Sequence, residues 1–291
     1  MISIVICSRD NTLLNAVSQS IKETIGLPYE IIAIDNRESK YGICKAYNLG
    51  ASKAKYDIFC FMHEDIAFVT QNWGVNVLSH LKDERVGLIG IAGAEPKLIV
   101  PASFDASILN VETNIIYDNI KDNECKQTTY TSSPDDDSII KQVVGVDGVW
   151  LCTKRSVFEK FKFDELTLTG FHGYDIDFSL QVFSEFKVCV VFDILLKHYS
   201  CGRCDRKYVA GKLEIYKKWR KKLPMSYRKH SDKEYLEFHW RALNNFMGLI
   251  INLKYNYFFV LYYFFVFSCN RFFSIKPFFK VLKKVVVQKL V

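Results

Sequence analysis

The sequence predicts an α/β protein with a mostly parallel central sheet flanked by helices. Two observations predict this fold class. Over the first 65 residues, apolar segments of strand length alternate with segments in which apolar residues recur at helical spacing. Each predicted strand also ends in a cluster of polar residues. A β-α-β-α-β order of this kind is typical of parallel sheets whose strands are connected by helices.

The first half of the chain passes through these elements without long gaps. A β-branched run predicts a strand over residues 2–7, and apolar spacing predicts a helix over about 11–25. A second strand over 29–34 and a second helix over about 41–54 follow. The third strand, at 58–62, is apolar on both faces, which indicates a position inside a parallel sheet.

Polar side chains follow each of these three strands. Ser8 and Arg9 end the first, Asp35 and Asn36 the second, and His63, Glu64 and Asp65 the third. Because open parallel sheets bind ligands beyond the carboxyl ends of their strands, we expect these groups along one edge. Arg9 would pair with phosphate, Asp35 with a ribose or base, and Asp65 with a metal that bridges phosphates. A helix N-cap is the alternative for Asp65.

No glycine-rich phosphate loop accompanies this pattern. The sequence has neither G-x-G-x-x-G after the first strand nor G-x-x-x-x-G-K-[ST]. A nucleotide bound at this edge would therefore depend on a metal ion for its phosphates.

The second half is predicted with more irregular structure. A helix is expected over about 66–81 and a strand over 86–92, followed by surface loops that include residues 118–124 and 132–137. The sheet resumes at 143–152. A helix that begins after Gly173 carries Asp175 and Asp177 in its first turn, and a last strand over 188–196 leads to His198.

Three sequence blocks carry a resemblance to a known family. They are Tyr-Gly-Ile-Cys-Lys-Ala-Tyr-Asn-Leu-Gly at 41–50, Ala-Lys-Tyr-Asp at 54–57 and Phe-Met-His-Glu-Asp at 61–65. With the Gly-Tyr-Asp-Ile-Asp segment at 173–177, they resemble the inverting family 2 glycosyltransferases, and most closely the subgroup named for a streptomycin-biosynthesis protein. The resemblance covers residues 1 to about 205 and implies a GT-A fold, with a nucleotide-sugar as donor.

The resemblance also implies roles for individual residues. The first Asp of the family's E-D-x-D motif is the general base, which places Asp175 in that role, and the D-x-D motif implies Asp65 as a ligand of Mn²⁺ or Mg²⁺. His63 and His198 are further candidate ligands, although the first acid of D-x-D is His63 here and the Glu of E-D-x-D is Tyr174. The candidate substrate-binding residues are Ser8, Arg9, Asp35, Asn36, Lys45, Asn48, Glu64, Asp147, Trp150 and Asp177.

Structural roles remain open for several of these residues. Asp175 in a first helical turn also fits an N-cap, and Asp147 beside Gly148 also fits a turn. Trp150 fits either a sugar-stacking ring or the core. His198 fits an ordinary polar or core histidine equally well.

The last part of the chain is basic and aromatic. The net charge is +7, with acids concentrated before about residue 190 and bases after about 200. The apolar run at 257–267 is shorter than the roughly 20 residues that span a bilayer, and lysines follow it. We expect a helix in the interface of an anionic membrane. Packing on the catalytic domain, or a homodimer through the C-terminal helices, is the alternative.

The sequence thus predicts two regions: a glycosyltransferase domain over 1–207, with a nucleotide-binding half (1–92) and an acceptor half (93–207), and a helical extension over 208–291. The expected activity is metal-assisted, inverting transfer to a glycan or lipid-linked acceptor. A non-catalytic relative that binds nucleotide-sugar or glycan is the alternative. No nucleic-acid-binding motif is present. Reduced, buried cysteines and no signal peptide lead us to expect a cytoplasmic protein on the inner membrane face.

Overall fold

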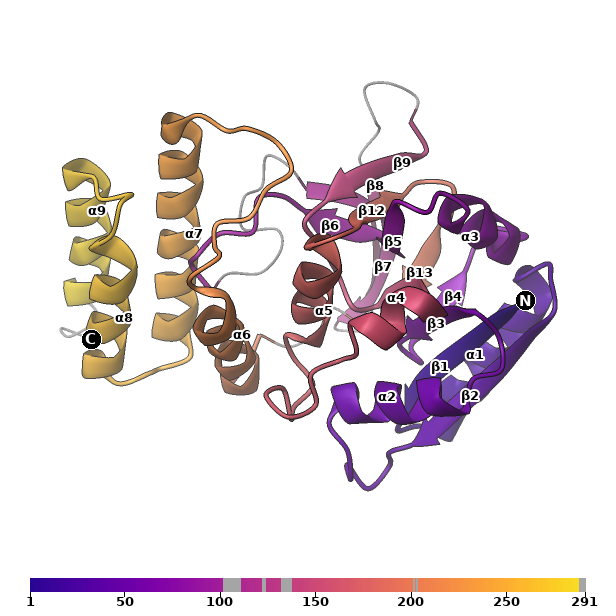
Figure 1. Cartoon of the computed structure of the whole chain (residues 1–291). Coiled ribbons are helices and arrows are strands. Elements are labelled where there is room, and N and C mark those ends of the chain that lie inside the picture. Colours follow the sequence, from indigo (N-terminus) through magenta and orange to yellow (C-terminus); the bar gives the residue numbers. More distant parts are fainter. Residues whose placement is uncertain (102–110, 122–123, 132–137, 201, 203, 288–291) are drawn as a thin grey trace.

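The computed structural model describes residues 1–101, 111–121, 124–131, 138–200, 202 and 204–287. Two sheets and a set of helices are arranged in an elongated molecule, with the last three helices at one end and the first strands at the other (Figure 1). The expected α/β class with C-terminal helices is confirmed.

Seven described strands form the central sheet. In spatial order they are β2 (Tyr29–Asp35), β1 (Ile2–Ser8), β3 (Ile58–Met62), β11 (Trp150–Lys154), β5 (Val86–Gly90), β12 (Lys187–Val191) and β9 (Ile140–Val143). The first three are parallel, as predicted, but β11 runs antiparallel between β3 and β5, and β9 runs antiparallel to β12. Five of the seven strands therefore run in the same direction, and the sheet is mostly parallel, with β11 and β9 as its two antiparallel strands.

A second sheet lies beyond the carboxyl ends of the central strands. Its order is β10 (Gly145–Val146), β6 (Ala92–Ala94), β7 (Val111–Lys121), β13 (Leu196–His198) and β4 (Ile66–Phe68), and β8 (Glu124–Thr131) pairs with β7. Two expectations are corrected here. The segment predicted as a helix from residue 66 starts as β4, because Ile66–Phe68 pairs with β13. Of the loop expected at 118–124, residues 118–121 belong to β7 and Glu124 to β8, whereas residues 122–123 and the loop at 132–137 lie outside the described residues.

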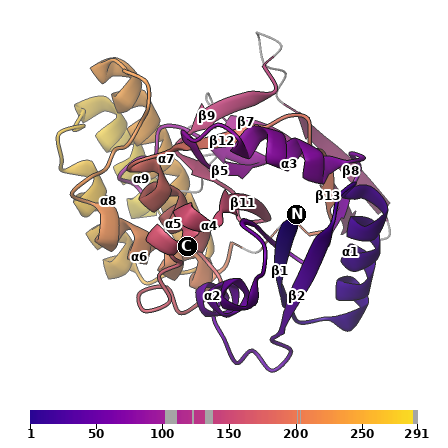
Figure 2. The same cartoon turned by 45° about the vertical axis from the view of Figure 1, so that its right-hand side comes forward.

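Helices cover both faces of the central sheet (Figure 2). The described helices are α1 (Asn11–Thr24), α2 (Ile43–Lys53), α3 (Trp73–Leu81), α4 (Arg155–Lys160), α5 (Tyr174–Phe183), α6 (Arg206–Trp219), α7 (Asp232–Asn252), α8 (Tyr257–Ser268) and α9 (Ile275–Val287). One buried core joins the sheet to α2, α4 and α5, and another joins its opposite face to α1 and α3. Alternating side chains of each strand supply the two cores, as a pleated strand requires.

Two cysteines in adjacent strands form a disulfide. Cys60 on β3 lies directly opposite Cys152 on β11, and their sulfurs are bonded across 92 residues of sequence. The expectation that buried cysteines are all reduced is wrong for this pair. Cys7, Cys44 and Cys189 are free thiols. The pairing depends on β11 entering the sheet beside β3, a neighbour relation that sequence spacing does not reveal.

The C-terminal helices α7, α8 and α9 have a core of their own. That core also takes in Leu98 and Val100 from the loop after β6, and Val209 and Leu213 from α6. Helix α6 contributes Ile215 and Trp219 to the sheet core at the same time, so it belongs to both units. The division at residue 207 remains a prediction. Among the described helices, none has the length and apolar character needed to cross a membrane.

Candidate active site

The three parallel strands end side by side. Ser8 lies opposite Asp35 in the β1–β2 register, and Ile6 lies opposite Met62 in the β1–β3 register, one residue before His63. The polar groups that follow these strands are therefore gathered along one edge of the sheet, as the sequence pattern predicted. This edge faces the second sheet, which supplies His198.

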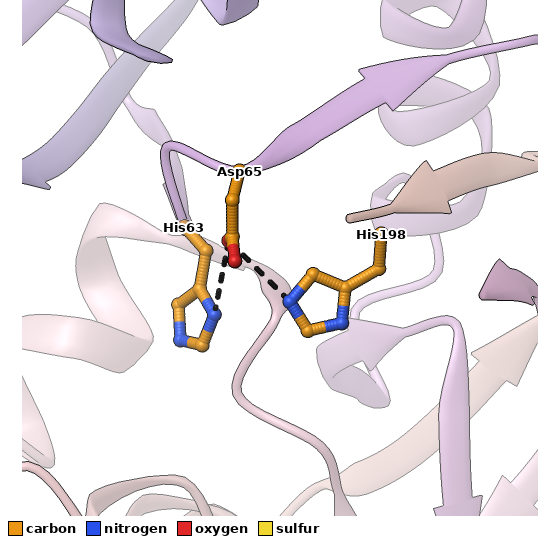
Figure 3. Close-up of side chains that lie close together, drawn as sticks. All are labelled: His63, Asp65 and His198. Carbon is orange, nitrogen blue, oxygen red and sulfur yellow. Dashed lines mark ion pairs between the residues drawn. The ribbon is translucent and has the colours of Figure 1, made fainter. Parts of the chain in front are cut away.

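His63, Asp65 and His198 point toward one another at this edge (Figure 3). His198 Nε2 is 3.3 Å and His63 Nδ1 is 3.8 Å from Asp65 Oδ1, and one ligand atom from each of the three lies within 4.8 Å of the others. Asp65 and His198 are held in place because β4 and β13 pair, which sets His198 opposite Ile66. Two imidazole nitrogens and one carboxylate oxygen in this spacing can hold a divalent transition metal.

The protonation of this cluster suits a cation. Burial, and after it the neighbouring His198, lower the pKa of His63 to about 4, although Asp65 and Asp175 partly oppose the shift. Burial would raise the pKa of Asp65, but the hydrogen bond and charge of His198 outweigh it and leave that pKa well below its usual range. At neutral pH the cluster therefore presents a neutral His63 and an ionised Asp65. His198 Nδ1 is buried without a hydrogen-bond partner in the described structure.

Asp175 lies close to this cluster. It is the second residue of α5, which begins after Gly173 in a left-handed conformation, φ +87°, that glycine adopts readily. The residue before it, Tyr174, places its hydroxyl 3.0 Å from His63 Nε2. The Asp175 side chain is partly exposed, and no hydrogen bond to its carboxylate is found within the described part of the chain. A carboxylate in this position is able to accept a proton.

Asp147 lies near Asp175 and is half-buried. Burial and the charge of Asp175 raise the pKa of Asp147, while the N–H of Val149, His198 and Lys212 oppose the shift. Its Oδ1 accepts a hydrogen bond from that N–H at 2.9 Å, so the turn predicted as the alternative is present.

Two buried lysines that sequence reasoning missed complete this neighbourhood. Lys97 and Lys212 are 8% and 5% exposed, and burial together with Lys212 lowers the pKa of Lys97 to about 7. Lys212 follows Gly211, where an added Cβ would lie 2.9 Å from His172, so α6 approaches the turn before Asp175 closely. Neither lysine belongs to a motif, and only the packing of α6 reveals its place.

The residues predicted to bind the donor differ in their exposure and in their partners. Asp35 is exposed, and the hydrogen bonds from Arg37 lower its pKa to about 2. The Arg9 guanidinium lies over the Phe171 ring at 5.6 Å. Ser8 is buried at 3% exposure, and its carbonyl accepts from Asn36 N at 2.7 Å. Ser8, Arg9, Asp35 and Asn36 therefore lie along the sheet edge predicted to bind the nucleotide.

Other predicted site residues have structural partners. Glu64 accepts the backbone N–H groups of Arg9 at 3.0 Å and Asp10 at 3.3 Å, which holds the start of α1. The Asn36 amide binds Tyr41 O at 2.9 Å. Asn48 ties α2 to the segment after α4 through Phe163 O at 2.9 Å and lines a pocket of about 640 Å³ there. Lys45 is exposed on α2, where its ammonium lies 5.7 Å from the Tyr41 ring.

Two of the predictions are corrected by burial. Trp150 is fully buried and contacts the Trp73 ring edge-on, so no face of its ring is open to a sugar and the core alternative holds. Asp177 is 1% exposed and accepts from Trp219 Nε1 at 2.7 Å and Lys218 Nζ at 2.9 Å. Asp177 joins α5 to α6 and faces no substrate. The i, i+2 spacing of Asp175 and Asp177 points them in different directions, which the helical period of 3.6 already implied.

The α/β fold, with its His–Asp–His cluster beside a carboxylate at a helix N-terminus, is of the GT-A class. The chain belongs to the glycosyltransferase-like family, whose model matches residues 3–227. The expected enzyme class is thereby confirmed. No curated protein sequence matches the chain.

Two solved structures share this fold. GalNAc-T7 with UDP, GalNAc and Mn²⁺ aligns with a TM-score of 0.50 at 12% identity, over 98% of this chain and 54% of that one. The mannosyltransferase PcManGT from Pyrobaculum calidifontis, in complex with GDP-Man and Mn²⁺, aligns with a TM-score of 0.50 at 11% identity, over 99% of this chain and 86% of that one. This chain thus spans about half the length of the GalNAc-T7 chain. At these identities the likeness establishes the fold alone.

Proposed function

We propose that this glycosyltransferase moves a sugar from a nucleotide-sugar donor to a hydroxyl of a glycan or lipid-linked acceptor, with inversion at the anomeric carbon and help from a divalent metal. The observation that carries the proposal is the connection between two parts of the site. The His63–Asp65–His198 cluster reaches Tyr174 through a 3.0 Å hydrogen bond, and the next residue is Asp175. Membership in the streptomycin-named subgroup is part of the same proposal.

The metal would be held by His63, Asp65 and His198. When bound there, it neutralises the negative charge that develops on the departing nucleoside diphosphate. The donor set includes two imidazoles, which suit transition metals better than Mg²⁺, so Mn²⁺ is the favoured ion. Mn²⁺ is also the ion in the GalNAc-T7 and PcManGT structures compared above.

Asp175 would act as the general base. Its partly exposed carboxylate takes the proton of the acceptor hydroxyl as that oxygen attacks the anomeric carbon. A single base suffices for inversion, because the leaving diphosphate needs charge neutralisation rather than a proton. Asp147 lies next to Asp175, and its partly exposed carboxyl group is placed to form a hydrogen bond with a sugar hydroxyl.

The proposal is tested by a thermal-shift screen of UDP- and GDP-sugars with and without Mn²⁺. We expect stabilisation that requires both components, because binding to the folded state alone raises the melting temperature by mass action. Asp65→Asn should remove the effect of Mn²⁺. Asp193→Asn is the matched control, since it takes the carboxylate from another His–Asp pair, with His80 at 2.8 Å, outside the site. If no nucleotide-sugar stabilises the protein with any metal, the proposal fails. If one binds but no acceptor is glycosylated, the non-catalytic alternative is favoured.

We further propose that α8 and α9 rest on an anionic membrane at the cytoplasmic face. Phe258, Tyr262 and Phe265 recur at i, i+4 and i+7 on α8 and are 81%, 63% and 47% exposed, while the opposite face of the helix is buried. Exposed Phe273, Ile275 and Phe279 extend this apolar surface into α9. Exposed Lys276, Lys280 and Lys283 lie on the same helix, where each would add about 1 kcal/mol toward anionic headgroups.

Vesicle sedimentation tests the membrane proposal. The wild type should sediment with vesicles that contain about 30% phosphatidylglycerol, because this anionic lipid attracts the lysines of α9. It should sediment less with vesicles of pure phosphatidylcholine, which carry no net charge. Phe258→Ser with Tyr262→Ser should reduce sedimentation, whereas Leu166→Ser, at a remote apolar residue of 89% exposure, should not. A dimer in solution that the double variant dissociates would instead favour contact between two copies.

A further inference from the structure

His63 is held at two points, by its backbone and by its ring. Its backbone N–H donates to Val149 O at 3.0 Å, and its ring nitrogen Nε2 is 3.0 Å from the Tyr174 hydroxyl. That hydroxyl in turn lies 2.9 Å from the carbonyl oxygen of Gly148. The other ring nitrogen, Nδ1, faces Asp65 (Figure 3).

The direction of these hydrogen bonds follows from counting protons. A carbonyl oxygen only accepts, so the single proton of the Tyr174 hydroxyl is committed to Gly148 O. The bond between Tyr174 and His63 then needs a proton from His63 Nε2. A neutral imidazole carries one N–H, so Nδ1 is left with its lone pair. Asp65 does not reverse this assignment, because its 3.8 Å distance from Nδ1 is too long for a hydrogen bond.

Packing leaves the Tyr174 hydroxyl little freedom. The residue is 4% exposed, and its ring contacts the rings of Tyr47 and Phe163. An added Cβ at Gly148 would lie 2.1 Å from the hydroxyl oxygen, so only glycine permits this approach. The hydroxyl is therefore placed before any ligand binds.

We infer that Tyr174 is a positioning residue, which fixes His63 as the Nε2–H tautomer and so directs the Nδ1 lone pair toward the metal site. The inference rests on the proposed function, since it assumes that the His63–Asp65–His198 cluster holds a metal. It assigns a role that the resemblance to known glycosyltransferases does not supply, because His63 and Tyr174 are the two positions at which the chain departs from the family motifs. The two departures contact each other.

The first test is the affinity for Mn²⁺ alone, measured by isothermal titration calorimetry without donor. Loss of the partner that orients a histidine ligand typically costs about 10- to 100-fold in metal affinity, so Tyr174→Phe should weaken Mn²⁺ binding by about that factor. Tyr235→Phe, on α7, is the control for loss of a tyrosine hydroxyl elsewhere. In a His63→Ala background, Tyr174→Phe should have no further effect, because the interaction it removes is already absent.

The second test reads the tautomer directly in metal-free protein. Long-range ¹H–¹⁵N correlation spectra of the six histidines, with His63 assigned from the His63→Ala spectrum, should show His63 protonated at Nε2. Tyr174→Phe should shift it toward a mixture of tautomers. Protonation at Nδ1 in the wild type would overturn the inference, as would unchanged Mn²⁺ affinity in a folded Tyr174→Phe protein. If the wild type binds no Mn²⁺, the proposed metal site fails, while the tautomer measurement still decides the role of Tyr174.

Discussion

Asp65 and Asp175 are both acidic residues of the same neighbourhood, yet their surroundings prepare them for different tasks. Asp65 stands between two imidazoles and stays ionised, which suits a metal ligand. Asp175 is partly exposed at the start of α5, without a bond to its carboxylate in the described residues, which suits a base. The difference arises from their neighbours: His198, which is distant in sequence, for Asp65, and the adjacent Gly173 turn for Asp175.

Asp175→Asn is predicted to lower the rate of transfer by about 10²- to 10⁴-fold, the usual contribution of a general base. The amide keeps the shape of the side chain but cannot take the acceptor's proton. Binding of the nucleotide-sugar with Mn²⁺ should remain near the wild-type value, because the metal cluster is intact. Steady-state kinetics and a thermal-shift titration measure the two effects. Unchanged turnover in this variant would remove Asp175 from the mechanism.

At the scale of elements, α5 and α6 are joined by a buried charge. Asp177 on α5 accepts from both Lys218 and Trp219 of α6, and Lys218 also binds Asp164 at 2.6 Å. This junction sets α6 against the turn that precedes Asp175. The position of the proposed base therefore depends on a carboxylate that faces no substrate.

Asp177→Asn is predicted to destabilise the protein by about 1–3 kcal/mol, because the buried carboxylate loses its charge-assisted hydrogen bonds from Trp219 and Lys218. Urea unfolding measures the change. Glu214→Gln on α6 is the control: it breaks the exposed pair with Lys217 at 2.7 Å, which should cost less than about 1 kcal/mol. Equal effects of the two variants would show that the α5–α6 junction contributes no more than a surface pair.

At the scale of the whole molecule, the C-terminal helices are attached through a core that is partly polar. His239 on α7 is fully buried and donates from Nε2 to Phe267 O on α8 at 2.7 Å. Burial lowers the pKa of this imidazole to about 4. The attachment of α8 to α7 is therefore sensitive to acid, even though the proposed catalytic cluster lies elsewhere.

Stability should fall as the pH is lowered from about 6.5 toward 4. In that window His239 binds a proton in the unfolded chain but not in the folded protein, and this lowers the free energy of unfolding. The full pKa difference corresponds to about 3 kcal/mol. Above pH 6.5 the contribution of His239 is constant. Urea unfolding of the wild type and His239→Gln at pH 7.5 and 5 measures it, since glutamine keeps an N–H donor but does not titrate. The prediction is wrong if the difference between the two proteins is the same at both pH values.

Local patterns sufficed for the α/β class, the parallel strands β1, β2 and β3, the α5 helix with its acidic first turn, and the helical tail. These features depend on residues close in sequence: apolar periodicity, β-branched runs and the polar residues at strand ends. The same patterns placed Asp65 at the edge of the sheet, because a strand must end where its apolar run ends.

The tertiary structure alone decided how distant segments meet. It turned β11 antiparallel beside β3, paired Cys60 with Cys152, buried Trp150 and Asp177, and brought Lys97 and Lys212 to Asp175. It also joined His63 to Tyr174, although 111 residues separate them. Sequence periodicity reports which face of an element is apolar, but not which other element covers that face. The burial of a side chain and the direction of its hydrogen bonds depend on contacts between such elements, and these contacts form only in the folded chain.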